Sequence, residues 1–213
     1  MLHVCHRQHD KGGVGMTTAV FTKTNHPGSA MLNQTNASWA TLRAASAAIA
    51  VSTFSINCSA GYYLYRAFAT FNTSTIPLGA IIDGWSLALT RYDPYLTFAN
   101  ANSTRIEVIP STQVDPTSLA TTDYDNISFV SKGNRNLADF AVTGNTYSIT
   151  GTGMDIVVPG GWTKMCLTMG RDLDNVAPTG DNSIGLVNAE LTVEYHLQSI
   201  PSTSISDENG VEI

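Results

Sequence analysis

The stretch YYLYRAFATF-NTSTIPLGA-IIDGWSLALT, residues 62–90, determines the fold that we predict. Two apolar, aromatic-rich runs flank a break of Asn, Ser, Thr, Pro and Gly, which is typical of two β-strands joined by a loop. In the second run, Asp83, Trp85, Leu87 and Leu89 fall on one face and smaller residues fall on the other. A period of two predicts a strand with one buried face and one solvated face.

The first run, residues 62–71, is apolar on both faces and contains one charged residue, Arg66. A strand of this kind is expected to lie centrally, with neighbours over both of its surfaces. A buried arginine is nearly always paired. We therefore expect Arg66 to pair with a carboxylate or with loop carbonyls near the end of a sheet.

The pattern Tyr-x-x-Tyr-Arg-Ala-Phe-x-x-Phe-Asn-Thr-Ser-x-Ile-Pro-x-Gly-Ala-x-Ile, which begins at Tyr62, resembles the DNRLRE-type β-sandwich domain. Similar domains occur in bacterial surface proteins and, as stand-alone chains, in tailed-phage genomes. The resemblance runs from Ala30 to Tyr195. It includes Ser38-Trp39-Ala40-Thr41 as the first core strand of the family, Pro116-Thr117-Ser118-Leu119 in a mid-chain loop, and Tyr147-Ser148-Ile149-Thr150 and Gly161-Trp162-Thr163-Lys164-Met165 in the closing half.

The rest of the chain carries many short strand patterns separated by turn residues, which indicates a β-sandwich. We predict an all-β, two-sheet antiparallel β-sandwich that is jelly-roll-like. In the last strand, Leu191, Val193, Tyr195 and Leu197 are expected to point inward. The expected strands are 17–24, 39–43, 51–56, 105–109, 127–130, 146–150, 165–169 and 190–197, with a turn at 93–94 and helical turns within 44–50 and 115–124.

The composition predicts an N-terminal arm at residues 1–16, a single β-sandwich domain at 17–197 and a polar C-terminal tail at 198–213. The opening MLHVCHRQHD lacks the apolar stretch of a signal peptide. Polar arms cannot bury enough apolar surface to offset their ordering entropy. We therefore expect at least one arm to contact another chain, in a homo-oligomer or a capsid-bound subunit.

Charged residues make up only 13% of the 213-residue chain, well below the roughly 25% of a typical soluble domain. A surface dominated by Ser, Thr and Asn suits a protein that packs against others or faces a harsh exterior medium. The net charge of -6 and the absence of a basic run argue against nucleic acid as a partner. No window of eighteen apolar residues is present, so we expect no membrane partner.

Two sets of residues have metal-ligand chemistry. Asp172, Asp174 and Asp181 lie in an oxygen-rich loop that is suited to a structural calcium ion, with ordinary turn chemistry as the alternative. The crowded His3, Cys5, His6 and His9 lie on the arm. Zinc needs four ligands that converge from a folded scaffold, so docking of the arm on a neighbouring subunit is the alternative for this second set.

Aromatic residues beside turns are the candidates for sugar binding, because their rings can stack on the apolar faces of sugars. These candidates are Trp162, Tyr92 and Tyr95. Capping of the ends of the sandwich core is the alternative role for them.

No catalytic residue is predicted, because paired carboxylates in a suitable context and a nucleophile elbow are both missing. The stretch KGGVGMTT, residues 11–18, resembles a variant phosphate loop, but Met16 stands where the loop needs a lysine. We therefore interpret this stretch as a glycine-rich hinge.

These observations favour a non-enzymatic structural or surface protein of a virus particle, with a capsid decoration or head-fibre subunit of a tailed phage as first choice. Assembly inside the host cytoplasm followed by lysis would place a protein without a signal peptide on the virion surface. The expected partners are the chain itself and other virion proteins. The alternative is a carbohydrate-binding module that attaches the particle to host-surface glycans.

Overall fold

The computed structural model describes residues 15–24, 29–32, 38–44, 48–50, 54–60, 63–98 and 104–198, with the side chains of 29–32, 48–50 and 93–98 excepted. Most of the predicted arm and tail lies outside these ranges, so the division into arm, domain and tail stays a prediction. Strands predominate in the described part. Its helices are short: α1 (Trp39–Ala44), α2 (Gly170–Leu173), and the 3-10 turns η1 (Thr121–Tyr124), η2 (Leu137–Asp139) and η3 (Met154–Ile156).

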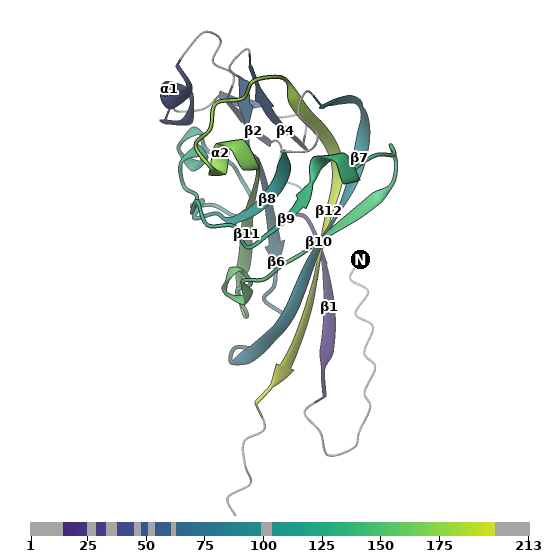
Figure 1. Ribbon diagram of the computed structural model, residues 1–213. Helices are drawn as coiled ribbons and strands as arrows, with labels where there is room; N and C mark the ends of the chain where they lie inside the picture. The colour runs from purple at the N-terminus through teal and green to yellow at the C-terminus, as the bar shows by residue number, and fades with distance from the viewer. Residues whose placement is uncertain are drawn as a thin grey trace, which may run out of the picture.

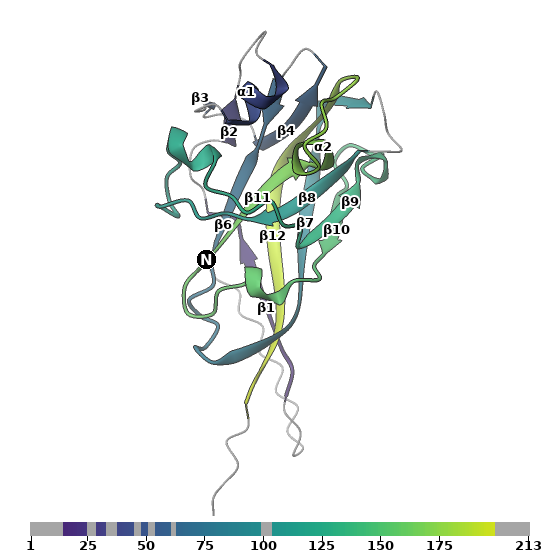
Figure 2. The ribbon, with the colours of Figure 1, turned by 60° about the vertical axis from the view of Figure 1, so that its left-hand side comes forward.

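Two antiparallel sheets form a sandwich (Figures 1 and 2). The small sheet has the order β6 (Ala67–Asn72), β11 (Trp162–Met169), β8 (Arg105–Pro110) and β9 (Gly133–Asn136). The large sheet has the order β10 (Thr146–Thr150), β7 (Ala80–Phe98), β12 (Asn182–Leu197), β4 (Phe54–Ser59), β5 (Tyr63–Tyr65), β2 (Ser29–Leu32) and β3 (Ala48–Ala50). A further strand, β1 (Thr17–Thr22), pairs with β12 beyond β4.

The connectivity is that of a jelly roll. Its eight strands, in chain order, are β4, β6, β7, β8, β9, β10, β11 and β12. In the large sheet the first, eighth, third and sixth of these lie side by side, and in the small sheet the second, seventh, fourth and fifth do. This arrangement confirms the predicted two-sheet antiparallel sandwich, and β1, β2, β3 and β5 are additions to the large sheet.

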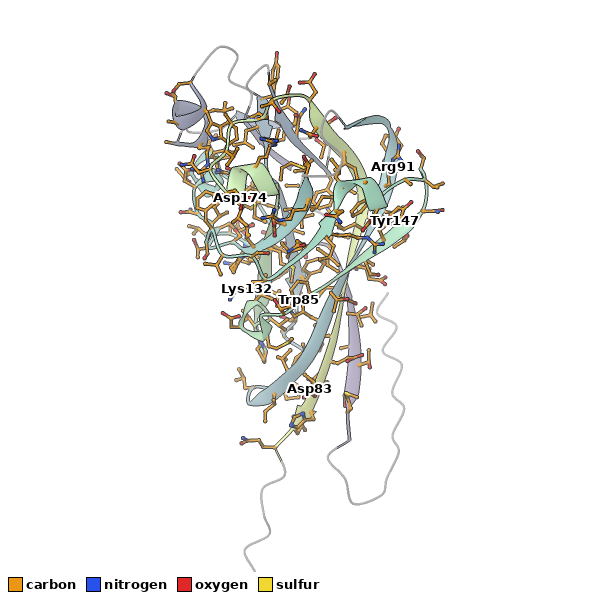
Figure 3. All side chains as sticks on the ribbon, in the orientation of Figure 1. Asp83, Trp85, Arg91, Lys132, Tyr147 and Asp174 are labelled. Atoms are coloured by element: carbon orange, nitrogen blue, oxygen red, sulfur yellow. The ribbon has the colours of Figure 1, made fainter. Side chains whose placement is uncertain are left out.

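One apolar core fills the space between the two sheets, and β7 contributes its predicted face. Trp85, Leu87 and Leu89 are all buried in this core. The Trp85 indole N–H donates a hydrogen bond of 2.9 Å to the carbonyl of Gly153. A Cβ at Gly151 would lie 1.7 Å from Trp85 Cε2, so only glycine allows the indole to pack here (Figure 3).

The outer face of the small sheet is also apolar. Phe68, Ile109, Leu119 and Cys166 form a second buried cluster there, against which Ile127 packs. The segment 111–130 covers this face, and its carbonyl at Pro116 accepts a hydrogen bond of 2.6 Å from Thr70 Oγ1. Covered surfaces on both sides explain why β6 is apolar on both faces, although β6 lies at an edge of its sheet rather than centrally.

The first apolar run is not one strand. Residues 63–65 form β5 in the large sheet, and residues 67–72 form β6 in the small sheet. The chain therefore passes from one sheet to the other at Arg66. This corner could not be recognised in the sequence, because the residues before it and after it are both apolar. The residues before it pack in the large sheet, and those after it pack in the small sheet.

The expected strand at 39–43 is wrong, because this segment is helix α1. Ser38 caps the helix: its Oγ accepts a hydrogen bond of 3.2 Å from the Thr41 N–H. Leu42 is fully buried on the inner side of the helix. The helical turn expected within 44–50 does not extend to residue 50, because Ala48–Ala50 forms strand β3.

Other boundaries also differ from the prediction. Ile127 makes only an isolated bridge with Ser111, so 127–130 is not a strand. Strand β4 begins at Phe54, whereas residues 51–53 of the expected strand lie outside the described ranges. Strand β7 continues through Pro94, where pairing with β12 jumps from Tyr92 to Thr97. The proline interrupts the ladder without ending the strand, because it lacks the N–H that the ladder needs.

Figure 1 shows that β1, β7 and β12 extend beyond the sandwich, at the end opposite α1. We call this extension the stalk: residues 80–84 of β7 and residues 194–197 of β12, together with β1 beside them. Because the core does not reach its end, Leu197 is 53% exposed, against the prediction that it points inward. Asp83, labelled in Figure 3, is exposed on the stalk, and its Oδ2 atom lies 2.8 Å from Nδ1 of His196.

The register of β12 can be tested with a pair of neighbouring substitutions. Val193→Asp places a charge in the core, because Val193 is fully buried. We expect it to lower the free energy of unfolding by on the order of 4 kcal/mol or more. Thr192→Asp changes the outward-facing neighbour and is expected to have little effect. Urea unfolding followed by circular dichroism measures both, and equal losses would mean that the register is wrong by one residue.

Candidate functional site

Arg66 lies in a buried ion pair with Asp172. The Nε and Nη2 atoms of Arg66 donate hydrogen bonds of 2.7 and 2.9 Å to the two carboxylate oxygens, and both side chains are fully buried. Nη1 donates a further hydrogen bond of 2.9 Å to the carbonyl of Tyr124. Of the two predicted kinds of partner for Arg66, a carboxylate or loop carbonyls, the carboxylate is confirmed, and the one carbonyl belongs to the end of η1.

Four further groups belong to this ion cluster, and one of them is the Asp125 carboxylate, whose Oδ1 lies 3.3 Å from Arg66 Nη1. Arg43 Nε, from α1, donates a hydrogen bond of 3.0 Å to Asp172 Oδ1, and Thr168 Oγ1, from β11, donates one of 2.7 Å to Oδ2. The Arg66 guanidinium lies 3.9 Å from the centroid of the Tyr124 ring. The cluster therefore joins α1, the corner at Arg66, η1, β11 and α2.

The charges in the cluster stabilise each other. Burial alone would raise the pKa of Asp172, but its hydrogen bonds with Arg66 and the charge of Arg66, together with Thr168 and Arg43, lower it below the usual value. Burial alone would lower the pKa of Arg66, and Asp172 raises it instead. Since both oxygens of Asp172 are already engaged, the cluster acts as a structural element rather than as a reactive site.

The three aspartates of the predicted calcium site have separate partners. Asp172 belongs to the ion cluster, and Asp174 pairs with Arg105 at 3.1 Å (Figure 3). Asp181 accepts a hydrogen bond from Ser59. Within the described ranges, no group of three His, Cys, Asp or Glu side chains could hold a metal ion. The calcium site stays a prediction that gains no support from these contacts, and His3, Cys5, His6 and His9 lie outside the described residues.

The predicted sugar-stacking residues do not form one site. Tyr92 is 57% exposed on β7 of the large sheet, and Trp162 is half-buried at the start of β11 in the small sheet. The side chain of Tyr95 lies outside the described residues. Tyr92 is therefore the candidate whose ring is placed to meet a ligand.

A hollow of about 430 Å³ opens on the outer face of the large sheet, and we call it the outer hollow. It lies across β10, β7, β12 and the end of β1, at a point where the register of β7 and β12 shifts between Leu186 and Asn188. The residues that line it are Thr22, Lys23, Ala88, Thr90, Thr146, Val187, Asn188, Ala189 and Glu190.

Two opposite charges border the outer hollow. Lys23 Nζ lies 5.0 Å from the centroid of the Phe54 ring, and burial lowers the pKa of Lys23. Neither Lys23 nor Glu190 forms an ion pair with any residue that the structure describes. Lys23 is paired with Ala189, whose side chain faces the core, so the ammonium group of Lys23 points to the core side, toward Phe54. The hollow therefore offers the Glu190 carboxylate as its charged acceptor.

Strand β1 has an open edge. It pairs with β12 on one side, and the topology of the described strands places none on its other side. The Lys23 N–H donates a hydrogen bond of 3.0 Å to the carbonyl of Ala189, in the same register. Because antiparallel pairing alternates, the N–H and C=O groups of Thr18, Val20 and Thr22 point toward the open edge.

The cysteines that the structure describes are not placed to act as nucleophiles. Cys58 and Cys166 are buried free thiols. Burial raises the pKa of Cys58 to about 12 and also raises that of Cys166. A thiol is nucleophilic as the thiolate, so neither is a candidate nucleophile at neutral pH.

Comparison with known proteins yields no match to a protein-family model and no match to a curated protein. Among the helices in the described ranges, none has the length and apolarity needed to cross a membrane.

Sequence reasoning missed the partner of Arg66 and the outer hollow. Asp172 lies 106 positions from Arg66, and its acidic loop suggested calcium instead. The hollow combines residues of four strands around a register shift, and no local pattern in the sequence signals such a shift.

Loss of one partner in the buried ion pair should destabilise the fold strongly. Asp172→Asn removes the buried counter-ion of Arg66 and leaves only the exposed carboxylate of Asp125 beside Nη1, so we expect the free energy of unfolding to fall by about 3–5 kcal/mol. Asp174→Asn is the matched control, because Asp174 pairs with Arg105 on the surface, and should cost less than about 1 kcal/mol. Urea unfolding at pH 7 measures the free energy of unfolding of both variants. Similar decreases in the two variants would refute a structural role for the cluster.

The same pair predicts a dependence on pH. Because folding lowers the pKa of Asp172, its contribution to stability is present above the ordinary aspartate pKa of about 3.9 and is lost as the pH falls further. The difference in unfolding free energy between wild type and Asp172→Asn should therefore be largest near neutral pH and shrink in acid. A difference that stays constant from pH 7 into acid would contradict this assignment.

Proposed function

We propose that the chain is a non-enzymatic structural subunit of a virus particle, with a capsid decoration or head-fibre subunit of a tailed phage as the leading form. The single observation that carries this proposal is the open edge of β1 on the projecting stalk. Its partners in this role are other copies of the chain and other virion proteins, at the virion surface.

The edge of β1 is unusually accessible for pairing. Exposed edge strands in monomeric proteins are protected by charges, prolines or bulges. The sequence of β1, TTAVFT, contains no charge and no proline, and its pairing with β12 is regular over all six residues. An extended segment of another chain can add to such an edge through main-chain hydrogen bonds.

The stalk also suits attachment to a larger assembly. Thr17 lies opposite Tyr195, so residues 15 and 198, the first and the last that the structure describes, both lie at the stalk. Each strand of the stalk exposes an aliphatic side chain: Val20 on β1, Ile81 on β7 and Leu197 on β12. A neighbouring chain that pairs with β1 could cover such side chains.

Fold and resemblance support the virion setting. Jelly rolls occur in viral capsid proteins and in lectin domains, and a fold alone does not determine function. The resemblance to DNRLRE-type domains of tailed phages and the low content of charged residues favour a capsid protein over a lectin domain. The net charge of -6 is unfavourable for a nucleic-acid partner.

The proposal can be tested by removing one backbone donor from the open edge. Val20→Pro deletes an N–H that points away from β12, so it should leave the ladder of β1 intact while blocking pairing with another chain. Val20→Thr keeps the N–H and is the matched control. We expect wild type and Val20→Thr to form oligomers, or to bind phage particles that lack this protein, and we expect Val20→Pro to do neither.

Size-exclusion chromatography with light scattering measures the oligomers, and co-sedimentation measures binding to particles. Circular dichroism checks that both variants are folded. A wild-type chain that stays monomeric and ignores the particles would refute the structural-subunit proposal.

A carbohydrate-binding module is the second candidate function, with host-surface glycans as its ligands. The outer hollow and the exposed ring of Tyr92 on the same sheet favour it. The two functions are compatible, because the hollow and the open edge of β1 share only Thr22, at the end of β1.

A further inference from the structure

We propose that the outer hollow binds an uncharged saccharide unit, with Tyr92 as an adjacent stacking platform. The inference deepens the second candidate function, and it does not depend on assembly through β1. It assigns the binding role to residues of β1, β7, β10 and β12 rather than to Trp162.

The strands bring polar side chains into one row across the hollow. Thr146 of β10 lies opposite Thr90 of β7, which in turn lies opposite Asn188 of β12. The hydroxyl oxygens of Thr90 and Thr146 are 2.9 Å apart. Two hydroxyls and a primary amide supply both donors and acceptors, which matches the mixed hydrogen-bonding character of sugar hydroxyls.

The next row forms the floor of the hollow. Ala88 lies opposite Glu190, and Glu190 lies opposite Thr22 on its other side. The short side chain of Ala88, between Ser148 and Glu190, leaves space in this row. The register shift at Val187 displaces β12 relative to β7 just beside this space, which widens the hollow.

The charge of the hollow disfavours an anionic ligand. Glu190 supplies a negative charge on the outer face, whereas the ammonium group of Lys23 points to the core side, toward Phe54. A sugar hydroxyl can donate a hydrogen bond to the carboxylate, which partly restores the interaction that the carboxylate loses with water. The volume of about 430 Å³ falls at the small end of ligand pockets, which suits one or two sugar rings.

Tyr92 extends the site on one side. It lies two residues beyond Thr90 on the same strand, so the two side chains lie on the same outer face. A Cβ at Gly185, which is paired with Tyr92, would lie 3.9 Å from Tyr92 Cδ1, so the ring lies beside a backbone without a side chain. An exposed aromatic ring next to polar groups is suited to stacking on the apolar face of a sugar.

The test is an NMR titration of the ¹⁵N-labelled full chain. The neutral ligands are the methyl glycosides of glucose, galactose, mannose and N-acetylglucosamine, and glucuronate is the charged comparison. We expect at least one neutral glycoside to shift the amide signals of Thr90, Thr146 and Asn188. Ala88→Leu fills the floor of the hollow and should weaken this binding by about tenfold or more.

Ser86→Leu is the matched control. Ser86 lies two residues from Ala88 on the same face of β7 and does not line the hollow, so this variant should bind as the wild type does. Absence of shifts with every neutral glycoside, or binding of glucuronate alone, would overturn the proposal. Equal binding by the two leucine variants would also overturn it. None of these outcomes bears on the assembly of Val20→Pro, so the two proposals fail separately.

Discussion

The buried pair of Arg66 and Asp172 is the constraint on which the arrangement of the two sheets depends. Two charges removed from water are tolerated only when every donor and acceptor has a partner. Arg66 lies at the corner where the chain leaves the large sheet for the small one, and Asp172 follows the last strand of the small sheet. Their bidentate geometry, with Arg43 and Thr168 beside it, admits one orientation of this corner.

The two sheets differ in how they use their outer faces. The small sheet is covered by the segment 111–130 and buries a second apolar cluster around Phe68. The large sheet exposes polar side chains along β7 and β12, and it continues into the stalk. Both surfaces that we propose for recognition of other molecules lie on the large sheet, where the outer hollow and the open edge of β1 meet at Thr22.

The predictions from sequence succeeded where burial follows one regular period. Trp85, Leu87 and Leu89 were placed correctly because one face of β7 meets the core. The run through Arg66 was misread as a single strand, because covering layers on both sides of the small sheet remove the alternation that marks a strand. Long-range pairs such as Arg66 with Asp172, and register shifts such as that at Val187, arise from tertiary packing and leave no local pattern.

The position of β12 has a consequence for how the chain folds. Among the strands that the structure describes, β12 is the last in sequence, yet it lies in the large sheet between β7 on one side and both β4 and β1 on the other. Until it is synthesised, those three strands lack their common partner, and their edges stay open. Strand pairing over such long sequence separations makes folding slow and exposes a nascent chain to aggregation. The large sheet can therefore be completed only after β12 has been synthesised, although its two halves, β10 with β7 and β4 with β5, β2 and β3, pair without β12.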